Sequence, residues 1–213
     1  MLEHNPRQVC FDYELFSTSR GFNDHLNEAL ILLESFINLL NRHAIGYMLI
    51  CGTLLGKVRN DGFLPWDDDI DLLISTEDLN FISSLDLNDH HLLEHYNFKK
   101  FCHKSRLVSV KDEHITALNP DKAYNWPYID LFPYKTFSDD LYFFERYWSV
   151  AKMLPVKKMR FYHLEVSVPY DPDYFLSINY GHNYKVKCVS SNWNHKLEQH
   201  IPMIQIADIG DIT

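Results

Sequence analysis

The sequence predicts a single α/β domain, because helix-like and strand-like patterns alternate along it. Leucine and isoleucine recur at helical spacing from Leu26 to Leu40. After Gly46, the short apolar run from Tyr47 to Cys51 has the character of a buried strand. A length of 213 residues suits one domain with a proper core and is short for two. We therefore predict one domain over 1–213, with its core at about 23–200.

Further elements follow the same alternation. Residues 1–20 look like an irregular lead-in, and Ser75 with Asp78 is typical of a capping box that opens a helix. After Pro155 the signals weaken, and the C-terminal portion is predicted to be helical. Helices are predicted over 54–59, 75–85, 138–153, 174–179 and 192–199, and strands at the end of 66–74 and over 98–102, 106–110 and 128–132.

The composition is that of a packed globular chain. Hydrophobic residues make up 46% and charged residues 23%, and the aromatic share is high at 15%. Lys and Arg number 20 against 29 Asp and Glu, which gives a formal net charge of -9. Because an acidic chain repels a polyanion at long range, this charge counts against nucleic acid as the main partner.

The location expected for the chain is the cytoplasm. The N-terminal segment has no basic region followed by an apolar run, so it does not resemble a signal peptide. The most apolar stretch, from Leu26 to Leu40, is interrupted by polar residues and is too short to span a membrane. The four cysteines, Cys10, Cys51, Cys102 and Cys188, form no C-x-x-C pair. Reduced thiols are therefore favoured over a zinc site or a disulfide framework.

Two acidic residues interrupt the apolar run that ends the 66–74 segment. Asp69 and Asp71 stand two apart, so in a strand their side chains share one face, whereas Ile70 and Leu72 face the other. Buried carboxylates are costly unless they are neutralised, and a divalent cation neutralises them directly. The pattern therefore predicts that Asp69 and Asp71 bind Mg²⁺ (or Mn²⁺) together with a phosphate-bearing substrate. The alternative is a solvated acidic loop, which the adjoining apolar residues disfavour.

Asp130 repeats this arrangement in a second apolar strand, between Ile129 and Leu131. If that strand lies beside the one that carries Asp69 and Asp71, Asp130 either completes a three-carboxylate cation site or acts as a general base. The alternative for Asp130 is a capped turn, and the acid pair elsewhere in the chain makes this the weaker interpretation.

Upstream of the acids, Gly52 and Thr53 follow the first strand and open a helix. Glycine allows the backbone to approach a phosphate closely, and the free N–H groups at a helix start attract anions. Lys57 and Arg59 are nearby cations that either hold a diphosphate or lie exposed on the helix. Trp66 either stacks on a nucleobase or packs against the loop, and packing is the more common role of tryptophan. The residues predicted to bind the substrate or its phosphates are Gly52, Thr53, Lys57, Arg59, Trp66 and Asp67.

Several other catalytic patterns are absent from the sequence. It holds no G-x-S-x-G, P-loop or G-x-G-x-x-G motif, which removes the usual hydrolase, NTPase and dinucleotide-binding functions. His91 and His95 stand four apart, as on one face of a helix, but without an H-E-x-x-H motif. Surface histidines are therefore favoured over a zinc site at this position.

The motifs around the acidic residues resemble those of the LicD family, which contains bacterial phosphocholine transferases and has fukutin and fukutin-related protein as relatives. Gly52–Arg59 (GTLLGKVR) and Gly62–Asp71 (GFLPWDDDID) resemble the family's first motif. Tyr128–Pro133 (YIDLFP) resembles the second motif. The C-terminal motif is looser, and it is similar to Tyr180, Gly181, Tyr184 and His195. The similarity extends over roughly residues 25–196, which is most of the chain.

The resemblance implies a nucleotidyltransferase-type fold, in which helices flank a mixed β-sheet. It also implies an enzyme that moves a phospho-alcohol, such as phosphocholine or ribitol phosphate, from a CDP-activated donor to a glycan or glycolipid hydroxyl. Asp69 and Asp71 match the family's metal-binding acids, Gly52 and Thr53 match its phosphate-binding turn, and Asp130 matches its third acidic position. The cysteine cluster with which some animal members bind zinc has no counterpart in this sequence.

Two alternative functions are compatible with the same carboxylates. One is nucleotidyl transfer from a nucleoside triphosphate to a small molecule or RNA, although the acidic net charge disfavours RNA. The other is a non-catalytic nucleotide-binding module, which the presence of all three carboxylates disfavours.

Overall fold

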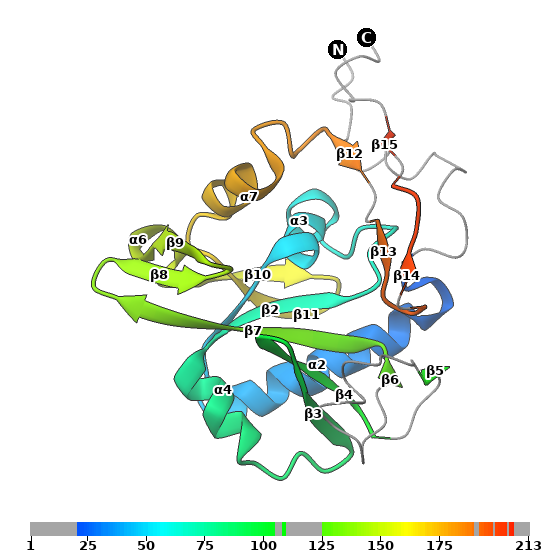
Figure 1. Ribbon diagram of the computed structural model, residues 1–213, viewed down its shortest axis with the longest axis vertical. Coiled ribbons are helices and arrows are strands. Elements are labelled where there is room, and N and C mark those ends of the chain that lie inside the picture. Colours follow the sequence, from blue (N-terminus) through cyan, green and yellow to red (C-terminus); the bar gives the residue numbers. More distant parts are fainter. Residues whose placement is uncertain are drawn as a thin grey trace.

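The computed structural model of the chain describes residues 21–104, 108–109, 125–189, 192–197, 199–203 and 205–206. A mixed β-sheet with helices on both faces forms the centre of the molecule (Figure 1). This arrangement confirms the predicted α/β fold with a mixed sheet flanked by helices. The predicted lead-in over residues 1–20 lies outside the described residues.

The central sheet has the strand order β1-β2-β7-β4-β3. Its strands are β1 (Tyr47–Leu49), β2 (Ile70–Ser75), β3 (His90–His95), β4 (Phe98–His103) and β7 (Tyr128–Phe137). β2 and β7 run parallel to each other, whereas the other neighbours in this order run antiparallel. Four predicted strands are therefore confirmed, although β1 is shorter and β7 longer than predicted.

β7 extends beyond its partner β4. The pairing with β4 reaches Leu131, and β8 (Asp140–Phe143) pairs with β7 from Lys135 onward. Pro133 has no N–H to donate, and it lies in the interval between these two partners. β9 (Arg146–Ser149) then pairs with β8 and completes this part of the sheet.

The main helices are α2 (Leu26–Arg42), α3 (Cys51–Asn60), α4 (Thr76–Ser83), α6 (Val150–Met153) and α7 (Pro172–Tyr180), and a short 3-10 helix, η1 (Asn23–His25), precedes α2. In Figure 1, α3 and α7 lie above β2 and β7, whereas α2 and α4 lie below them. The ring of Phe36 on α2 lies 4.6 Å from the ring of Phe101 on β4. Ser75 caps α4 as predicted, because its hydroxyl accepts a hydrogen bond from the N–H of Asp78 at 3.0 Å.

The described residues also form four two-stranded antiparallel sheets. These pair β5 (Val108–Ser109) with β6 (Asn125–Trp126), β10 (Lys157–Phe161) with β11 (Leu164–Val168), β12 (Cys188–Val189) with β15 (Gln205–Ile206), and β13 (Trp193–Asn194) with β14 (Gln199–His200). The β10–β11 hairpin attaches to the central sheet beside β1, where the hydroxyl of Tyr47 accepts a hydrogen bond from the N–H of Ser167 at 3.3 Å.

Two predicted helices are wrong. The segment 138–153 forms the β8–β9 hairpin and only the short helix α6. The segment 192–199 contains β13 and the start of β14 instead of a helix. The C-terminal portion therefore has one helix, α7, which confirms the helix predicted over 174–179, and then short strands in the part that the structure describes. The strand predicted over 106–110 is described only at β5.

The structure also places the paired histidines and two of the cysteines. His91 and His95 lie on β3, so they do not share a helix face. Cys51 and Cys102 are free thiols, as the reduced state predicted for the cysteines requires. Among the described residues, no helix has both the length and the apolar character that a membrane crossing demands.

Candidate functional site

The parallel pairing of β2 and β7 brings the three predicted carboxylates together. Asp71 and Asp130 are direct partners in this register, and Asp69 immediately precedes β2. One oxygen atom from each of the three lies within 4.8 Å of the other two, and all three side chains are buried. The geometry therefore meets the condition under which Asp130 was expected to join Asp69 and Asp71. We call these three residues the carboxylate cluster.

Two members of the carboxylate cluster, Asp71 and Asp130, resist ionisation. Burial, and then the charges of Asp69 and Asp130, raise the pKa of Asp71 well above its usual range. Burial also raises the pKa of Asp130 to about 6, although the ammonium of Lys100 acts in the opposite direction. Carboxylates that lack water and lie close together are costly to ionise, so a bound cation is their natural partner.

Lys100 is a site residue that the sequence analysis did not identify. It lies opposite Asp130 in the pairing of β4 with β7, and its Nζ donates to the two oxygens of Asp130 at 2.8 and 3.1 Å. Nζ also lies 3.5 Å from the ring centroid of Tyr128. A buried ammonium needs such partners, because its desolvation is costly. The neighbouring Lys99 pairs with the exposed Glu94 instead, and only the strand register distinguishes these two lysines.

Gly52 and Thr53 fix the position of the acidic loop. α3 begins at Cys51, so the predicted turn into a helix is confirmed. Thr53 is fully buried, and its hydroxyl accepts a hydrogen bond from the N–H of Asp71 at 2.9 Å. A Cβ atom on Gly52 would lie 2.6 Å from a carboxylate oxygen of Asp67, so the close approach of this loop requires glycine.

The two cations of α3 have different surroundings, and neither lies exposed. Lys57 is buried and donates to a carboxylate oxygen of Asp61 at 2.7 Å. Arg59 donates through Nη2 to the main-chain carbonyl oxygens of Tyr184 and Lys187. Burial lowers the pKa of Arg59 to about 10, and its Nε is buried without a hydrogen-bond partner in the described residues. Arg59 therefore retains a buried donor at Nε.

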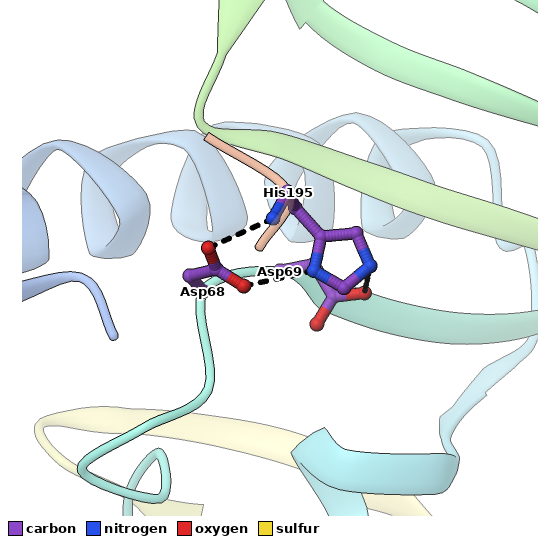
Figure 2. Close-up of side chains that lie close together, drawn as sticks. All are labelled: Asp68, Asp69 and His195. Atoms are coloured by element: carbon purple, nitrogen blue, oxygen red, sulfur yellow. Dashed lines mark hydrogen bonds and ion pairs between the residues drawn. The ribbon is translucent and has the colours of Figure 1, made fainter. Parts of the chain in front are cut away.

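A second group of ligating side chains adjoins the carboxylate cluster (Figure 2). Nδ1 of His195 lies 2.8 Å from Oδ1 of Asp68, and Nε2 lies 3.2 Å from Oδ2 of Asp69. The main-chain N–H groups of His195 and Lys196 also donate to Oδ2 of Asp68, at 3.0 and 3.4 Å. Asp68 thereby ties the segment 192–197 to the loop that leads into β2. The sequence analysis had left Asp68 without a role, since its partner lies far along the chain.

The charges of these carboxylates change the pKa values of His195 and Asp67. Burial alone lowers the pKa of His195, but the carboxylates of Asp69 and Asp68 more than offset this effect and raise it to about 9. Burial raises the pKa of Asp67 well above its usual range, and the charges of Asp69 and Asp68 raise it further. Oδ2 of Asp67 is buried without a hydrogen-bond partner in the described part of the chain. The acidic loop therefore concentrates negative charge in a place with little solvent.

A cavity of about 520 Å³ opens onto these groups. Asp67, Asp69, Asp71 and His195 all lie in its wall. Cavities of this size bury a ligand as large as a nucleotide, and a few convergent polar groups in a mainly apolar wall are typical of ligand sites. The ligating side chains are therefore accessible from a space that can hold a substrate.

Four of the six residues predicted to bind substrate line the cavity, and two do not. The lining residues are Gly52, Arg59, Trp66 and Asp67, and those outside the lining are Thr53 and Lys57. Thr53 instead holds the start of β2, and Lys57 is paired with Asp61 near the end of α3. Trp66 is 4% exposed, so it packs against the loop while one part of it forms the cavity wall.

The residues present fit a divalent cation with oxygen ligands. The carboxylate cluster supplies three buried carboxylates, which is the donor set that Mg²⁺ and Mn²⁺ prefer. The ammonium of Lys100 faces Asp130 and the imidazole of His195 reaches Asp69, yet the charge of Asp71 stays without an ion pair among the described residues. Asp69 and Asp71, with Asp130 beside them, are the residues that would hold such a cation.

Fold, motifs and carboxylates together define a nucleotidyltransferase-type domain, and comparison with known families specifies it further. Residues 44–171 match the family described as LicD/FKTN/FKRP, nucleotidyltransferase domain. This match covers more than half of the chain, so the protein belongs to this family, as its motifs predicted.

Relatives with curated sequences agree with this assignment. The chain is 39% identical over 70 residues to the lipopolysaccharide cholinephosphotransferase LicD of Haemophilus influenzae, a match that covers 33% of this chain and 26% of that protein. It is 31% identical over 144 residues to an uncharacterized protein of Rickettsia typhi, covering 66% of this chain and 41% of that one. The chain therefore spans less than half the length of these curated relatives.

Proposed function

We propose that this chain is a metal-dependent phosphotransferase. It moves a phospho-alcohol, of the phosphocholine or ribitol phosphate kind, from a CDP-activated donor to a hydroxyl of a glycan or glycolipid. The observation that carries the proposal is the carboxylate cluster, which the register of β2 and β7 assembles beside a nucleotide-sized cavity. Membership of the LicD family and the similarity to a cholinephosphotransferase support the reaction class.

The cation is assigned to Asp69 and Asp71, and Asp130 lies beside them. When bound, Mg²⁺ or Mn²⁺ would neutralise the charge of the donor diphosphate and of the group that leaves with it. Both aspartates line the cavity, so a diphosphate can reach them. Because Thr53 fixes the N–H of Asp71, the strand that carries these ligands cannot shift easily.

Asp130 is assigned the role of general base, which accepts the proton of the acceptor hydroxyl. Burial raises the pKa of Asp130 above its usual range in the cation-free chain, which favours uptake of a proton by this carboxylate. Lys100 holds both of its oxygens and limits its movement. Asp130 does not line the cavity itself, so the acceptor reaches it past Asp71, its partner in the register.

Arg59 and Trp66 are assigned to the donor. Arg59 lines the cavity and retains an unused buried donor at Nε, so it can meet a phosphate oxygen. Trp66 presents part of its indole to the same space, where it can stack on a base. Gly52 lines the same cavity, and a side chain at this position would collide with the carboxylate of Asp67.

The decisive experiment offers the purified chain Mg²⁺, a glycan acceptor and one of three donors: CDP-choline, CDP-ribitol or CTP. Release of CMP from a CDP-alcohol supports the proposal, whereas pyrophosphate release from CTP alone would show a nucleotidyltransferase instead. Binding of CDP without any product would show a non-catalytic module.

A pair of matched variants locates the reaction. Asp71→Asn should abolish CMP release while the far-UV circular dichroism spectrum stays unchanged. Asp139→Asn alters an exposed carboxylate in the turn between β7 and β8, and it should release CMP like the wild type. Undiminished release by Asp71→Asn would remove Asp71 from the proposed machinery.

A further inference from the structure

The outer strand of the β10–β11 hairpin concentrates positive charge in an acidic chain. Three of the five residues of β10, Lys157, Lys158 and Arg160, are cationic, and all three are exposed. β11 lies beside β1, so β10 forms the free edge of the hairpin. The whole chain has only 20 Lys and Arg against 29 Asp and Glu, so this cluster is a local exception to its charge. We call these three residues the basic edge.

The charges of the basic edge are not neutralised within the part of the chain that the structure describes. No ion pair joins any of the three to an acid among these residues. Arg160 stands opposite Glu165 in the pairing of β10 with β11, yet its Nε donates to the main-chain oxygen of Tyr162 at 2.8 Å. The basic edge therefore remains available to an external anion.

Aromatic rings support the two lysines of the basic edge. Nζ of Lys157 lies 4.2 Å from the ring centroid of Tyr170, and Nζ of Lys158 lies 5.6 Å from that of Tyr47. Long cationic side chains lay their stems along apolar surface and keep the charged group in water. Tyr170 is itself 45% exposed, so an amphipathic ring lies beside the cations at the surface.

A cavity of about 480 Å³ lies against the basic edge. Its lining includes Lys158, Arg160 and His163, against a single acid, Glu165. The hollow is therefore lined mainly by groups that attract an anion, and a phosphate-bearing group is of a suitable size to enter it.

We propose that the basic edge docks this protein on an anionic lipid surface, with phosphate-bearing headgroups against its three cations. Lys158 and Arg160 share one face of β10, whereas Lys157 belongs to the other. Cations on both sides of a free edge suit an extended anionic surface better than a single bound anion. The exposed ring of Tyr170 suits the same environment, because tyrosine favours the boundary between headgroups and water.

The turn of the hairpin connects the basic edge to the candidate site. The N–H of Tyr162 donates to the carbonyl oxygen of Asp61 at 2.7 Å, and its hydroxyl accepts the N–H of Phe63 at 3.1 Å. A Cβ atom on Gly62 would lie 2.6 Å from the ring of Tyr162, so this contact is close. Leu64, the next residue, lines the site cavity. A docked hairpin would therefore hold that cavity near the lipid headgroups. This consequence rests on the proposed function, since a glycolipid acceptor would be presented there.

The experiment sediments vesicles with the full chain and measures the bound fraction at low and high salt. Vesicles of phosphatidylcholine mixed with phosphatidylglycerol should bind the wild type at low salt, whereas vesicles of phosphatidylcholine alone should not. High salt should release the protein, because it screens the attraction between exposed charges. The assay contains EDTA and no donor, so its result does not depend on the transfer reaction.

Variants of the basic edge test which residues bind the vesicles. Each cation near an anionic lipid surface strengthens binding about fivefold, so Lys157→Gln/Lys158→Gln/Arg160→Gln should weaken it about 100-fold. Lys157→Gln/Lys158→Gln keeps the hydrogen bond of Arg160 to the turn and should weaken binding about 25-fold.

A matched control removes the same amount of charge elsewhere. Lys104→Gln/Lys135→Gln/Arg146→Gln alters three exposed cations outside the hairpin and should bind the anionic vesicles like the wild type. Equal binding to both kinds of vesicle, or a triple variant of the basic edge that binds like the wild type, would overturn the inference. Binding to a soluble anionic polysaccharide without binding to either vesicle would also overturn it and would assign the basic edge to a glycan. Absence of CMP release bears only on the proposed function.

Discussion

The buried pair of Lys100 and Asp130 allows a sharp prediction, because its partners have little access to solvent. Their side chains are 3% and 6% exposed. Lys100→Met keeps most of the volume beneath Tyr128 but leaves Asp130 without its cation. Breaking a buried ion pair by removing one partner costs about 3–5 kcal/mol. Asp130 can take up a proton in place of the lost cation, so we expect the lower end of that range, about 3 kcal/mol at pH 7.

A double-mutant cycle separates the pair from the packing around it. Asp130→Asn and the double variant Lys100→Met/Asp130→Asn complete the cycle with the wild type, and urea unfolding followed by tryptophan fluorescence measures each free energy in the presence of EDTA. The double variant buries no unpaired charge, so it should be more stable than the sum of the two single changes predicts, by roughly 2 kcal/mol.

Metal provides the second arm of the same measurement. A divalent cation in the carboxylate cluster would partly replace the charge of Lys100, so the cost of Lys100→Met should shrink when EDTA is replaced by saturating Mg²⁺. A coupling energy near zero, or a Lys100→Met variant as stable as the wild type, would refute the view that this pair holds the site together.

Two further predictions concern residues around the cluster. Thr53→Val keeps the shape of the side chain but leaves the buried N–H of Asp71 without its acceptor, so urea unfolding should show that the free energy of unfolding falls by about 1–3 kcal/mol. Thr53→Ser should keep most of the wild-type stability. Equal stability of all three proteins would contradict this role of Thr53. His195 has a folded-state pKa raised from 6.5 to about 9, so the stability that it contributes is fully present below pH 6.5 and is lost as the pH rises through about 9. In EDTA, the advantage of the wild type over His195→Gln should therefore fall by roughly 3 kcal/mol across that window, and a flat difference would count against the ion pairs of His195.

Local patterns were sufficient to predict the acids of the site. Asp69 and Asp71 are two apart on an apolar strand, and this spacing alone places them on one face. Asp130 was predicted from the same kind of pattern. Lys100 and the contact of Asp68 with His195 were not predicted, because they depend on which residues of distant strands lie opposite each other. A single sequence carries no local sign of that register.

The wrong helix over 138–153 has a specific physical cause. Phe144 and Glu145 join β8 to β9, and they have φ values of 50° and 57°. A two-residue hairpin turn with both φ values positive normally uses Asn or Gly, so these residues give no turn signal. Leu141 and Trp148 face each other across the hairpin and are buried, but their spacing of seven also fits a helix. The periodicity was therefore ambiguous, and tertiary pairing decided the outcome.

The parallel pairing of β2 with β7 has a consequence for how the chain folds. Residues 71 and 130 meet only after the long intervening segment, which holds α4, β3 and β4, has been brought back on itself. Closing such a loop costs entropy before its contacts are gained, so this step is expected late and slow. His195 then adds a third stretch of chain from beyond α7. A cation held by the carboxylate cluster would have no binding site before β2 and β7 pair, so it would stabilise the finished fold, by about 2.7 kcal/mol when its concentration is a hundred times its dissociation constant.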